Sequence, residues 1–139
     1  MGVLRAAFVY FLIVFGAGFV LALVRIPFLV PRFGVRTAEL MEMPVMLAVI
    51  AWASWRLARG TPALSRAGRL AAGLLALCFL VITEVALGYA LGARSPGAYL
   101  EGRDPVSGLA YLASLVVFGL APALWTARRD RGHSKSADA

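Results

Sequence analysis

The sequence predicts an all-α integral membrane four-helix bundle, with residues 1–129 as one transmembrane domain, residues 130–139 as a flexible polar tail, and both termini in the cytoplasm. Hydrophobic residues make up 61% of the 139 residues and charged residues only 15%, and the mean hydropathy is +0.83. A soluble domain of this size buries too little surface to hide so much apolar material. Long apolar stretches, and the arginines that separate them, predict the number and direction of the helices.

Four apolar stretches are long enough to cross a bilayer, which takes about 20 residues of helix. They cover approximately residues 5–24, 38–55, 70–91 and 106–125. The first follows Arg5, as the apolar core of a secretory signal would, but it runs on to Arg25 without a small-residue cleavage site. Because a signal core is shorter than this, we expect the first stretch to remain as a transmembrane helix.

The positions of the cations predict the topology. The net charge is +7, and Lys135 is the lone lysine among the 14 Lys and Arg residues. Nucleic-acid-binding proteins are also basic, but here the cations flank apolar stretches and do not line one polar face. The side that holds both termini carries Arg5, Arg56, Arg59, Arg66, Arg69, Arg128, Arg129, Arg131 and Lys135. The opposite side carries the smaller set Arg25, Arg32, Arg36, Arg94 and Arg103.

Cations near helix ends concentrate on the cytoplasmic side of a membrane. Both termini are therefore expected in the cytoplasm, with the chain spanning a bacterial inner membrane several times. Trp52, Trp55 and Trp125 then lie at cytoplasmic helix ends, where indole rings favour the headgroup region. The arginines on this face would attract anionic lipid, so the bilayer, and not nucleic acid, is the expected partner of the positive charge.

The chain lacks the residues that most catalytic and metal sites need. Cys78 is the one cysteine and His133 the one histidine, which excludes an intramolecular disulfide, a zinc site, a haem ligand pair and a Cys/His catalytic couple. No nucleophile and base stand at a motif spacing, and no glycine-rich phosphate loop is present. We therefore expect no catalytic residues, no metal and no cofactor, and thus no enzyme.

Charged residues inside the apolar stretches are the candidates for function. A charge at the centre of a membrane helix costs about 2.5 to 3.5 kcal/mol on insertion scales, so each one needs a partner or a purpose. Glu84 shares a helix face with Gly88, and Arg25 shares one with Ala22, so both charges are expected to face neighbouring helices and not lipid. Glu42 lies at a similar depth near the outer end of the second stretch.

We therefore expect a charge cluster in the outer leaflet, built from residues of three different helices. Its members are Arg25, Glu39, Glu42 and Glu84, with Arg32, Arg36 and Pro44 as accessory residues. Two interpretations stay open: ion pairs that neutralise one another and set the helix register, or a site for binding or proton transfer. An arginine keeps its proton in a protein, so Arg25 requires a carboxylate or water beside it in either case.

Prolines interrupt the predicted helices. Pro44 removes the hydrogen bond to the Leu40 carbonyl, and Pro122 removes the one to the Phe118 carbonyl. In a membrane, neighbouring groups or water must satisfy such freed carbonyls. The Leu40 carbonyl is either an extra ligand of the charge cluster or part of a simple kink. Residues 26–33, which contain two further prolines, are expected to form a stiff apolar turn on the outer face.

The segment from Val24 to Pro44 resembles one found in uncharacterised small four-span inner-membrane proteins of bacteria. The likeness lies in Val24, Arg25, Pro31, Arg32 and the run from Arg36 to Pro44, and it implies the fold and location but no activity. Small multidrug exporters are similar in size and also use a membrane glutamate, but theirs lies in the first span, where this chain has none. The motif of membrane glutathione-transferase-like trimers is not found.

These observations favour a small non-enzymatic inner-membrane protein, an accessory or assembly partner that packs with itself as a homo-oligomer or with another membrane protein. The main alternative is a small proton- or ion-coupled transporter or channel subunit, with Glu84 and Glu42 as the carboxylates and Arg25 as the counter-charge. An enzyme that acts on lipid is a third and more distant reading.

Overall fold

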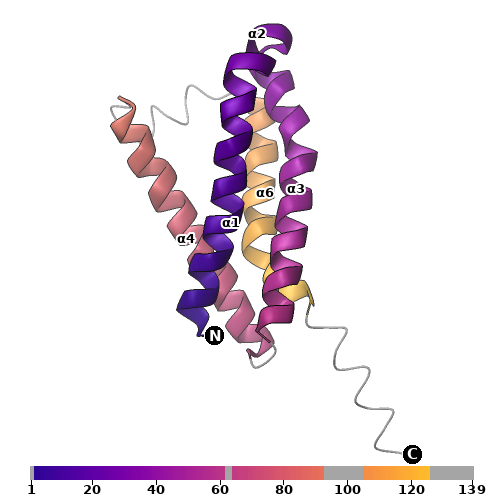
Figure 1. Ribbon diagram of the computed structural model, residues 1–139, viewed down its shortest axis with the longest axis vertical. Coiled ribbons are helices and arrows are strands. Elements are labelled where there is room, and N and C mark those ends of the chain that lie inside the picture. The colour runs from indigo at the N-terminus through magenta and orange to yellow at the C-terminus, as the bar shows by residue number, and fades with distance from the viewer. Residues whose placement is uncertain (1, 62–63, 93–104, 126–139) are drawn as a thin grey trace, which may run out of the picture.

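The computed structural model describes residues 2–61, 64–92 and 105–125, and the regular structure in these ranges is entirely helical (Figure 1). The chain forms α1 (Val3–Val24), the π-helical turn η1 (Arg25–Leu29), α2 (Val30–Phe33), α3 (Val35–Gly60), α4 (Arg66–Ala90) and α6 (Pro105–Leu124). The predicted all-α class is confirmed. The predicted tail, residues 130–139, lies outside the described residues.

Among the described residues, three helices are long and apolar enough to cross a membrane. They are Val3–Phe33, which joins α1, η1 and α2 over 31 residues, Val35–Gly60 with 26 residues and Arg66–Ala90 with 25 residues. The fourth predicted span corresponds to α6, whose apolar part, Gly108–Leu124, is shorter. The helices agree in position with the four predicted stretches but begin earlier, and α3 also ends later.

The connection between the first two long helices differs from the predicted stiff turn. Residues 25–33 remain helical, first as the π turn η1 and then as α2, and the chain reverses direction at Gly34. Pro31 stands in the first turn of α2. Gly34 has φ 83° and ψ 165°, which suits glycine and few other residues. The reversal therefore needs a single residue, which holds the ends of α2 and α3 together.

The four main helices form a ring in which each contacts two others. α1 packs against α3 and α4, and α6 packs against the same two helices, so α1 lies opposite α6 and α3 lies opposite α4. Alanine, branched aliphatic and aromatic side chains fill the centre; they are Ala6, Ala7, Tyr10, Phe11, Val14, Ile50, Ala53, Leu57, Ala72, Ala76, Leu80, Phe118 and Ala121. Where alanines face one another, helix backbones can approach closely and gain dispersion contacts.

The closest approach is between α4 and α6. A Cβ atom built on Gly73 would lie 2.2 Å from the carbonyl oxygen of Gly119 and 3.2 Å from Cγ of Pro122. Figure 1 shows that α4 then diverges, so that its Ala90 end leans away from the other three helices. The bundle is thus tight at the end that holds the N-terminus and splayed at the end that holds α2.

Side-chain hydrogen bonds tie the tight end together. Nε1 of Trp125 donates to Oγ of Ser54 at 2.9 Å and joins the end of α6 to α3. A guanidinium N–H of Arg69 donates to the carbonyl oxygen of Thr61 at 3.0 Å, just after α3 ends. Arg69 is only 3% exposed, so its side chain is enclosed by the bundle and does not lie on the surface. It satisfies a carbonyl at a helix end, where a cation is also favoured by the helix dipole.

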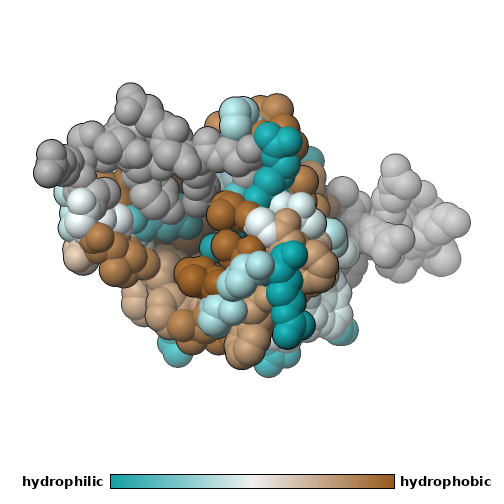
Figure 2. All heavy atoms as spheres, turned by 90° about the horizontal axis from the view of Figure 1, so that it is seen from above, coloured by the Kyte–Doolittle hydropathy of each residue, from teal (hydrophilic) through white to brown (hydrophobic). Residues whose placement is uncertain are grey.

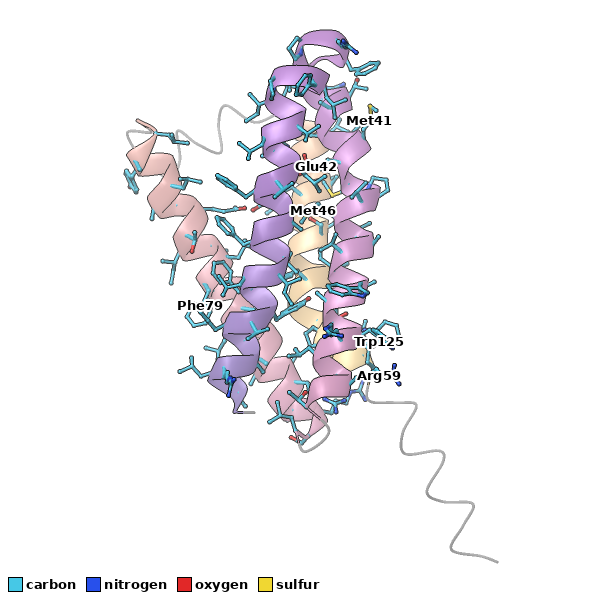
Figure 3. The ribbon with its side chains drawn as sticks, in the orientation of Figure 1. Met41, Glu42, Met46, Arg59, Phe79 and Trp125 are labelled. Atoms are coloured by element: carbon cyan, nitrogen blue, oxygen red, sulfur yellow. The ribbon has the colours of Figure 1, made fainter. Side chains whose placement is uncertain are left out.

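Tryptophan and arginine side chains surround this same end. The guanidinium of Arg59 lies over the ring of Trp55 at 4.8 Å, and that of Arg56 lies over Trp52 at 6.0 Å, within range of cation–π attraction. Figure 3 shows Arg59 and Trp125 near each other at the end opposite α2. The indole and guanidinium groups that the sequence places at one face therefore do gather at one end of the bundle.

Candidate functional site

The splayed end of the bundle contains a cavity of about 320 Å³. Residues from α1, η1, α3, α4 and α6 line it, and Phe118 lies at its inner end next to the core. Figure 2 views the molecule from this end and shows hydrophilic and hydrophobic side chains side by side around a hollow. A concave site of this size with a few polar groups in an apolar wall is typical of small-molecule binding.

Six polar or charged side chains reach this cavity: Arg25, Glu39, Glu42, Glu84, Tyr111 and Ser114. The four charged ones are the predicted members of the charge cluster, and they come from η1, α3 and α4. All four therefore line the same cavity, although their individual partners differ in part from the expected ones.

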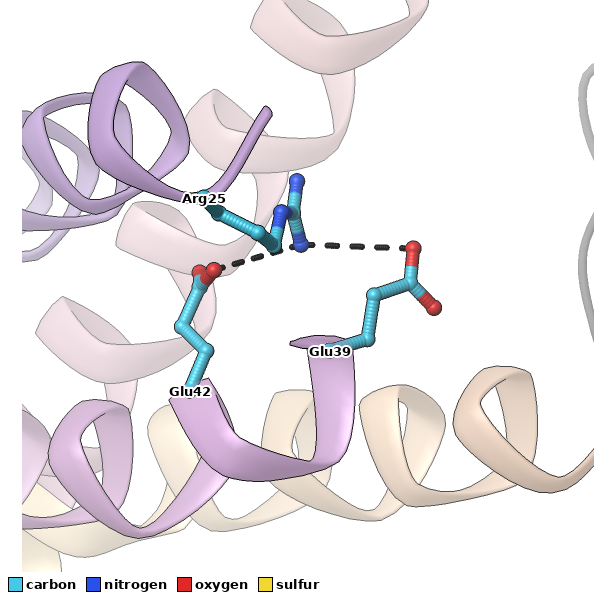
Figure 4. A network of polar contacts seen from close by, with 3 residues as sticks. All are labelled: Arg25, Glu39 and Glu42. Atoms are coloured by element: carbon cyan, nitrogen blue, oxygen red, sulfur yellow. Dashed lines mark ion pairs between the residues drawn. The ribbon is translucent and has the colours of Figure 1, made fainter. Parts of the chain in front are cut away.

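Arg25 pairs with two glutamates of α3 (Figure 4). Its NH1 lies 3.2 Å from Oε2 of Glu42 and 3.9 Å from Oε1 of Glu39. The side chains are mostly buried, with 23% of Arg25, 14% of Glu42 and 18% of Glu39 exposed. Glu39 and Glu42 are three residues apart and therefore share one face of α3. Arg25 reaches that face because α1 continues into η1 and the chain reverses direction only at Gly34.

Glu84 has a different partner. Its carboxylate accepts a hydrogen bond from the hydroxyl of Tyr111 on α6, and within the described ranges the ion pairs of Arg25 are those with Glu39 and Glu42. The expected ion pair between Arg25 and Glu84 is therefore not formed, although both line the cavity. α4 packs against α6 and lies opposite α3 in the ring, so Glu84 lies beside α6 and not beside α3.

The accessory residues lie elsewhere. Arg32 in α2, Arg36 at the start of α3, and Pro44 are exposed, and none of them belongs to the cavity lining. The Leu40 carbonyl was considered as an extra ligand, but Leu40 does not line the cavity either. Pro44 stands inside an α3 that runs unbroken from Val35 to Gly60. These residues lie toward the splayed end of the bundle but are separate from the cavity lining.

Tyr111 and Ser114 also line the cavity, and the sequence analysis did not predict them as members of the site. They stand three residues apart in an apolar helix, and this spacing places both on one face. Ser114 is 9% exposed, and its hydroxyl donates to the Tyr111 carbonyl oxygen at 2.7 Å. The polar pair on an apolar helix is the signal that could have identified this wall of the cavity.

Apolar side chains form most of the wall. Phe15 and Phe19 of α1 have ring centroids 6.3 Å apart, and Met43 and Met46 face them from α3. Figure 3 shows Glu42 and Met46 close together between α1 and α3. Aromatic rings and thioethers are polarizable and adapt to irregular apolar ligands. The cavity is therefore amphipathic, with carboxylates set into a soft apolar wall.

Among the described residues, the charges that line the cavity do not balance. Three carboxyl groups stand against one guanidinium, and that guanidinium already contacts two of the three. In the part of the chain that the structure describes, no three acidic, histidine or cysteine groups are placed to share a metal ion. Comparisons of the chain with known proteins find no matching family model, no similar curated protein and no similar solved structure.

Proposed function

We propose that the protein is a small non-enzymatic integral protein of the bacterial inner membrane, an accessory or assembly partner of another membrane protein or of a second copy of itself. The divergence of α4 is the observation that carries this proposal (Figure 1). It leaves a cavity with ionisable walls between α4 and α1, and its apolar rim is exposed: Leu91 to 81%, Phe19 to 50% and Leu87 to 40%. Ionisable groups that face hydrocarbon are costly, so a helix seated along this rim would be stabilising.

Site-specific photo-crosslinking in native membranes tests the assembly role. A photoreactive residue replaces Leu87, which lies on the rim of the cavity, and the matched control replaces Leu75, which lies on the same helix near the tight end and is 37% exposed. We expect a protein adduct from position 87 and none from position 75. An adduct of twice the chain mass would identify a second copy, and any other mass another protein. Equal adducts at both positions, or none at either, would contradict the proposal.

The proposed topology places the tight end in the cytoplasm and the cavity in the outer leaflet. The described arginines at the tight end include Arg5, Arg56, Arg59 and Arg66, against Arg25, Arg32 and Arg36 at the splayed end. The positive-inside rule supports this direction, and the exposed arginines would attract anionic lipid at the cytoplasmic face.

Cysteine labelling of intact cells tests this topology. In a Cys78→Ser background, which removes the lone cysteine, Arg32→Cys should react with a membrane-impermeant maleimide added from outside. Arg59→Cys should react only after the membrane is opened. The reverse pattern would overturn the topology.

A small proton- or ion-coupled transporter or channel subunit is the second candidate function. The convergence of Arg25, Glu42 and Glu84 on one cavity favours it, because ionisable groups in a membrane cavity are common parts of ion and proton pathways. In proteoliposomes, Glu42→Gln and Glu84→Gln should each abolish uptake driven by a pH gradient. Tyr89→Phe, which alters an exposed residue of α4 outside the lining, should not. If the glutamates only hold the helices together, their substitution lowers thermal stability and no transport is found in the unchanged protein.

The non-enzymatic part of the proposal is tested separately. The purified protein, incubated with inner-membrane lipid, should leave the lipid composition unchanged by mass spectrometry. Formation of a lipid product that depends on the protein would contradict the proposal and favour the lipid enzyme.

A further inference from the structure

We infer that the cavity at the splayed end is a binding site for an amphipathic organic cation, a molecule with one positive centre on an aromatic or aliphatic body. This goes beyond the assembly role, which concerns the rim, because it concerns the interior of the cavity. If the protein is a transporter, the second candidate function, this cation is the class of molecule that it would transport. The cation can also bind in a protein that transports nothing.

The shape and wall suit an organic molecule. A volume of about 320 Å³ lies at the lower end of the range of small-molecule pockets. The apolar wall includes Phe15 and Phe19 on one side and Met43 and Met46 on the other. Aromatic faces attract organic cations through the ring quadrupole, and methionine adapts to the shape of the ligand body.

The charges select for a cation. Arg25 contacts Glu42 at 3.2 Å and Glu39 at 3.9 Å, so one guanidinium serves two carboxyl groups. Glu84 has a neutral partner, the Tyr111 hydroxyl, and faces the same cavity from the other side. Opposite charges attract strongly where water is scarce, whereas an anion would face the carboxyl groups of Glu42 and Glu84 directly. A ligand cation between these two glutamates would offset part of the excess negative charge.

Access is from the splayed side. The wall residues Phe19 and Leu91 are 50% and 81% exposed, whereas Phe118 at the inner end is 1% exposed. An amphipathic cation collects at the membrane interface, because its body is apolar and its charge remains hydrated. When no partner helix covers the rim, it would therefore reach the cavity by entering between α1 and α4 with its apolar body first.

Binding is measured by equilibrium dialysis of the purified protein in nanodiscs of neutral phosphatidylcholine, with empty nanodiscs subtracted. The probe is the cation N-methyl-para-phenylpyridinium, and its counterpart of similar shape and opposite charge is para-phenylbenzoate. We expect saturable one-site binding of the cation and none of the carboxylate. Equal binding of the two ions would overturn the proposal, because it would show that charge does not select the ligand.

Two glycines of α1 provide a matched pair of variants. Gly18 lines the cavity, and a Cβ atom there would meet Cε of Met46 at 3.5 Å, an ordinary contact, so that the rest of a leucine would extend into the space. A Cβ atom on Gly16 would have nothing within 4 Å, and Gly16 does not line the cavity. Gly18→Leu should abolish cation binding and Gly16→Leu should leave it unchanged. Unchanged binding by Gly18→Leu would show that the probe lies elsewhere.

The charge of Glu84 is tested by Glu84→Gln, which keeps the shape of the side chain. Loss of one contact with a charged group should raise the dissociation constant of the cation about tenfold or more. If Gly18→Leu does not elute as a folded species in gel filtration, the affinity of Glu84→Gln for the cation decides whether the cation binds in the cavity. Retention of full affinity by Glu84→Gln would overturn the proposal. A failure here leaves the crosslinking result at Leu87 unaffected, so the two proposals fail separately.

Discussion

The hydroxyl of Tyr10 in α1 donates a hydrogen bond of 2.8 Å to the carbonyl oxygen of Phe118 in α6. This carbonyl is the one that Pro122 leaves without its helical donor, because proline has no N–H. The rings of Tyr10 and Phe118 also stack at 4.6 Å, and both residues are 1% exposed. A break in one helix is thus repaired by the helix on the opposite side of the ring, and the repair ties α1 to α6 through the core.

Tyr10→Phe should destabilise the protein by about 1 to 3 kcal/mol, because it leaves a buried carbonyl oxygen without a donor while keeping the ring. The measurement is thermal unfolding of the purified protein in detergent, followed by tryptophan fluorescence. Tyr89→Phe is the matched control, since Tyr89 is 49% exposed, and should shift the midpoint little.

The role of Pro122 in this bond is tested by a double substitution. In Pro122→Ala, the new N–H at position 122 can donate to the Phe118 carbonyl, so Tyr10→Phe should cost less in this background than in the unchanged protein. An equal cost in both backgrounds would show that the Tyr10 hydroxyl does not replace the missing helical donor.

Gly73→Ala should also destabilise the bundle, by about 1 to 3 kcal/mol. Its new methyl group would lie 2.2 Å from the backbone oxygen of Gly119, so that α4 and α6 must move apart. Gly16→Ala places the same methyl group where nothing lies within 4 Å, and it should stabilise α1 by up to about 1 kcal/mol through helix propensity. Thermal unfolding of the two variants checks the comparison. A Gly73→Ala protein as stable as Gly16→Ala would show that the helices are not in close contact there.

The ion pairs predict a pattern of coupling. Arg25→Gln and Glu42→Gln should each cost about 1 to 3 kcal/mol, because each leaves a mostly buried charge without its nearest partner. The double variant should cost clearly less than the sum of the two. Coupling between Arg25→Gln and Glu84→Gln should be smaller, because Glu84 is bonded to Tyr111. Thermal unfolding of the three single and two double variants measures both couplings, and stronger coupling of Arg25 to Glu84 than to Glu42 would contradict the pairing.

Gly34→Ala should destabilise the protein by about 1 to 3 kcal/mol, since φ 83° with ψ 165° is strained for any residue with a Cβ atom. Gly60→Ala, at the end of α3 with nothing within 4 Å of the new atom, is the control. Thermal unfolding is again the measurement. If Gly34→Ala is neutral, the reversal between α2 and α3 does not depend on this backbone conformation.

Several particular features follow from local sequence. Apolar stretches predict the helices, and the spacing of Glu39 and Glu42 places both on one face of α3, where the structure has them. The predicted turn at residues 26–33 is wrong, because these residues continue the helix, first as the π turn η1 and then as α2, and the chain reverses only at Gly34. The sequence showed that Pro122 frees a carbonyl, but it did not show which group would satisfy it.

By itself, the sequence determined the helical class, the apolar lengths and which charges lie at the same depth, since these depend on residues close together along the chain. The tertiary structure decided which helices are neighbours, and hence that Arg25 pairs with Glu42 while Glu84 pairs with Tyr111. A helix presents its polar groups to whatever lies beside it, so their partners depend on the ring order and on the tilt of α4. The cavity exists because α4 and α6 meet closely at Gly73 and then separate, and no local pattern encodes that angle.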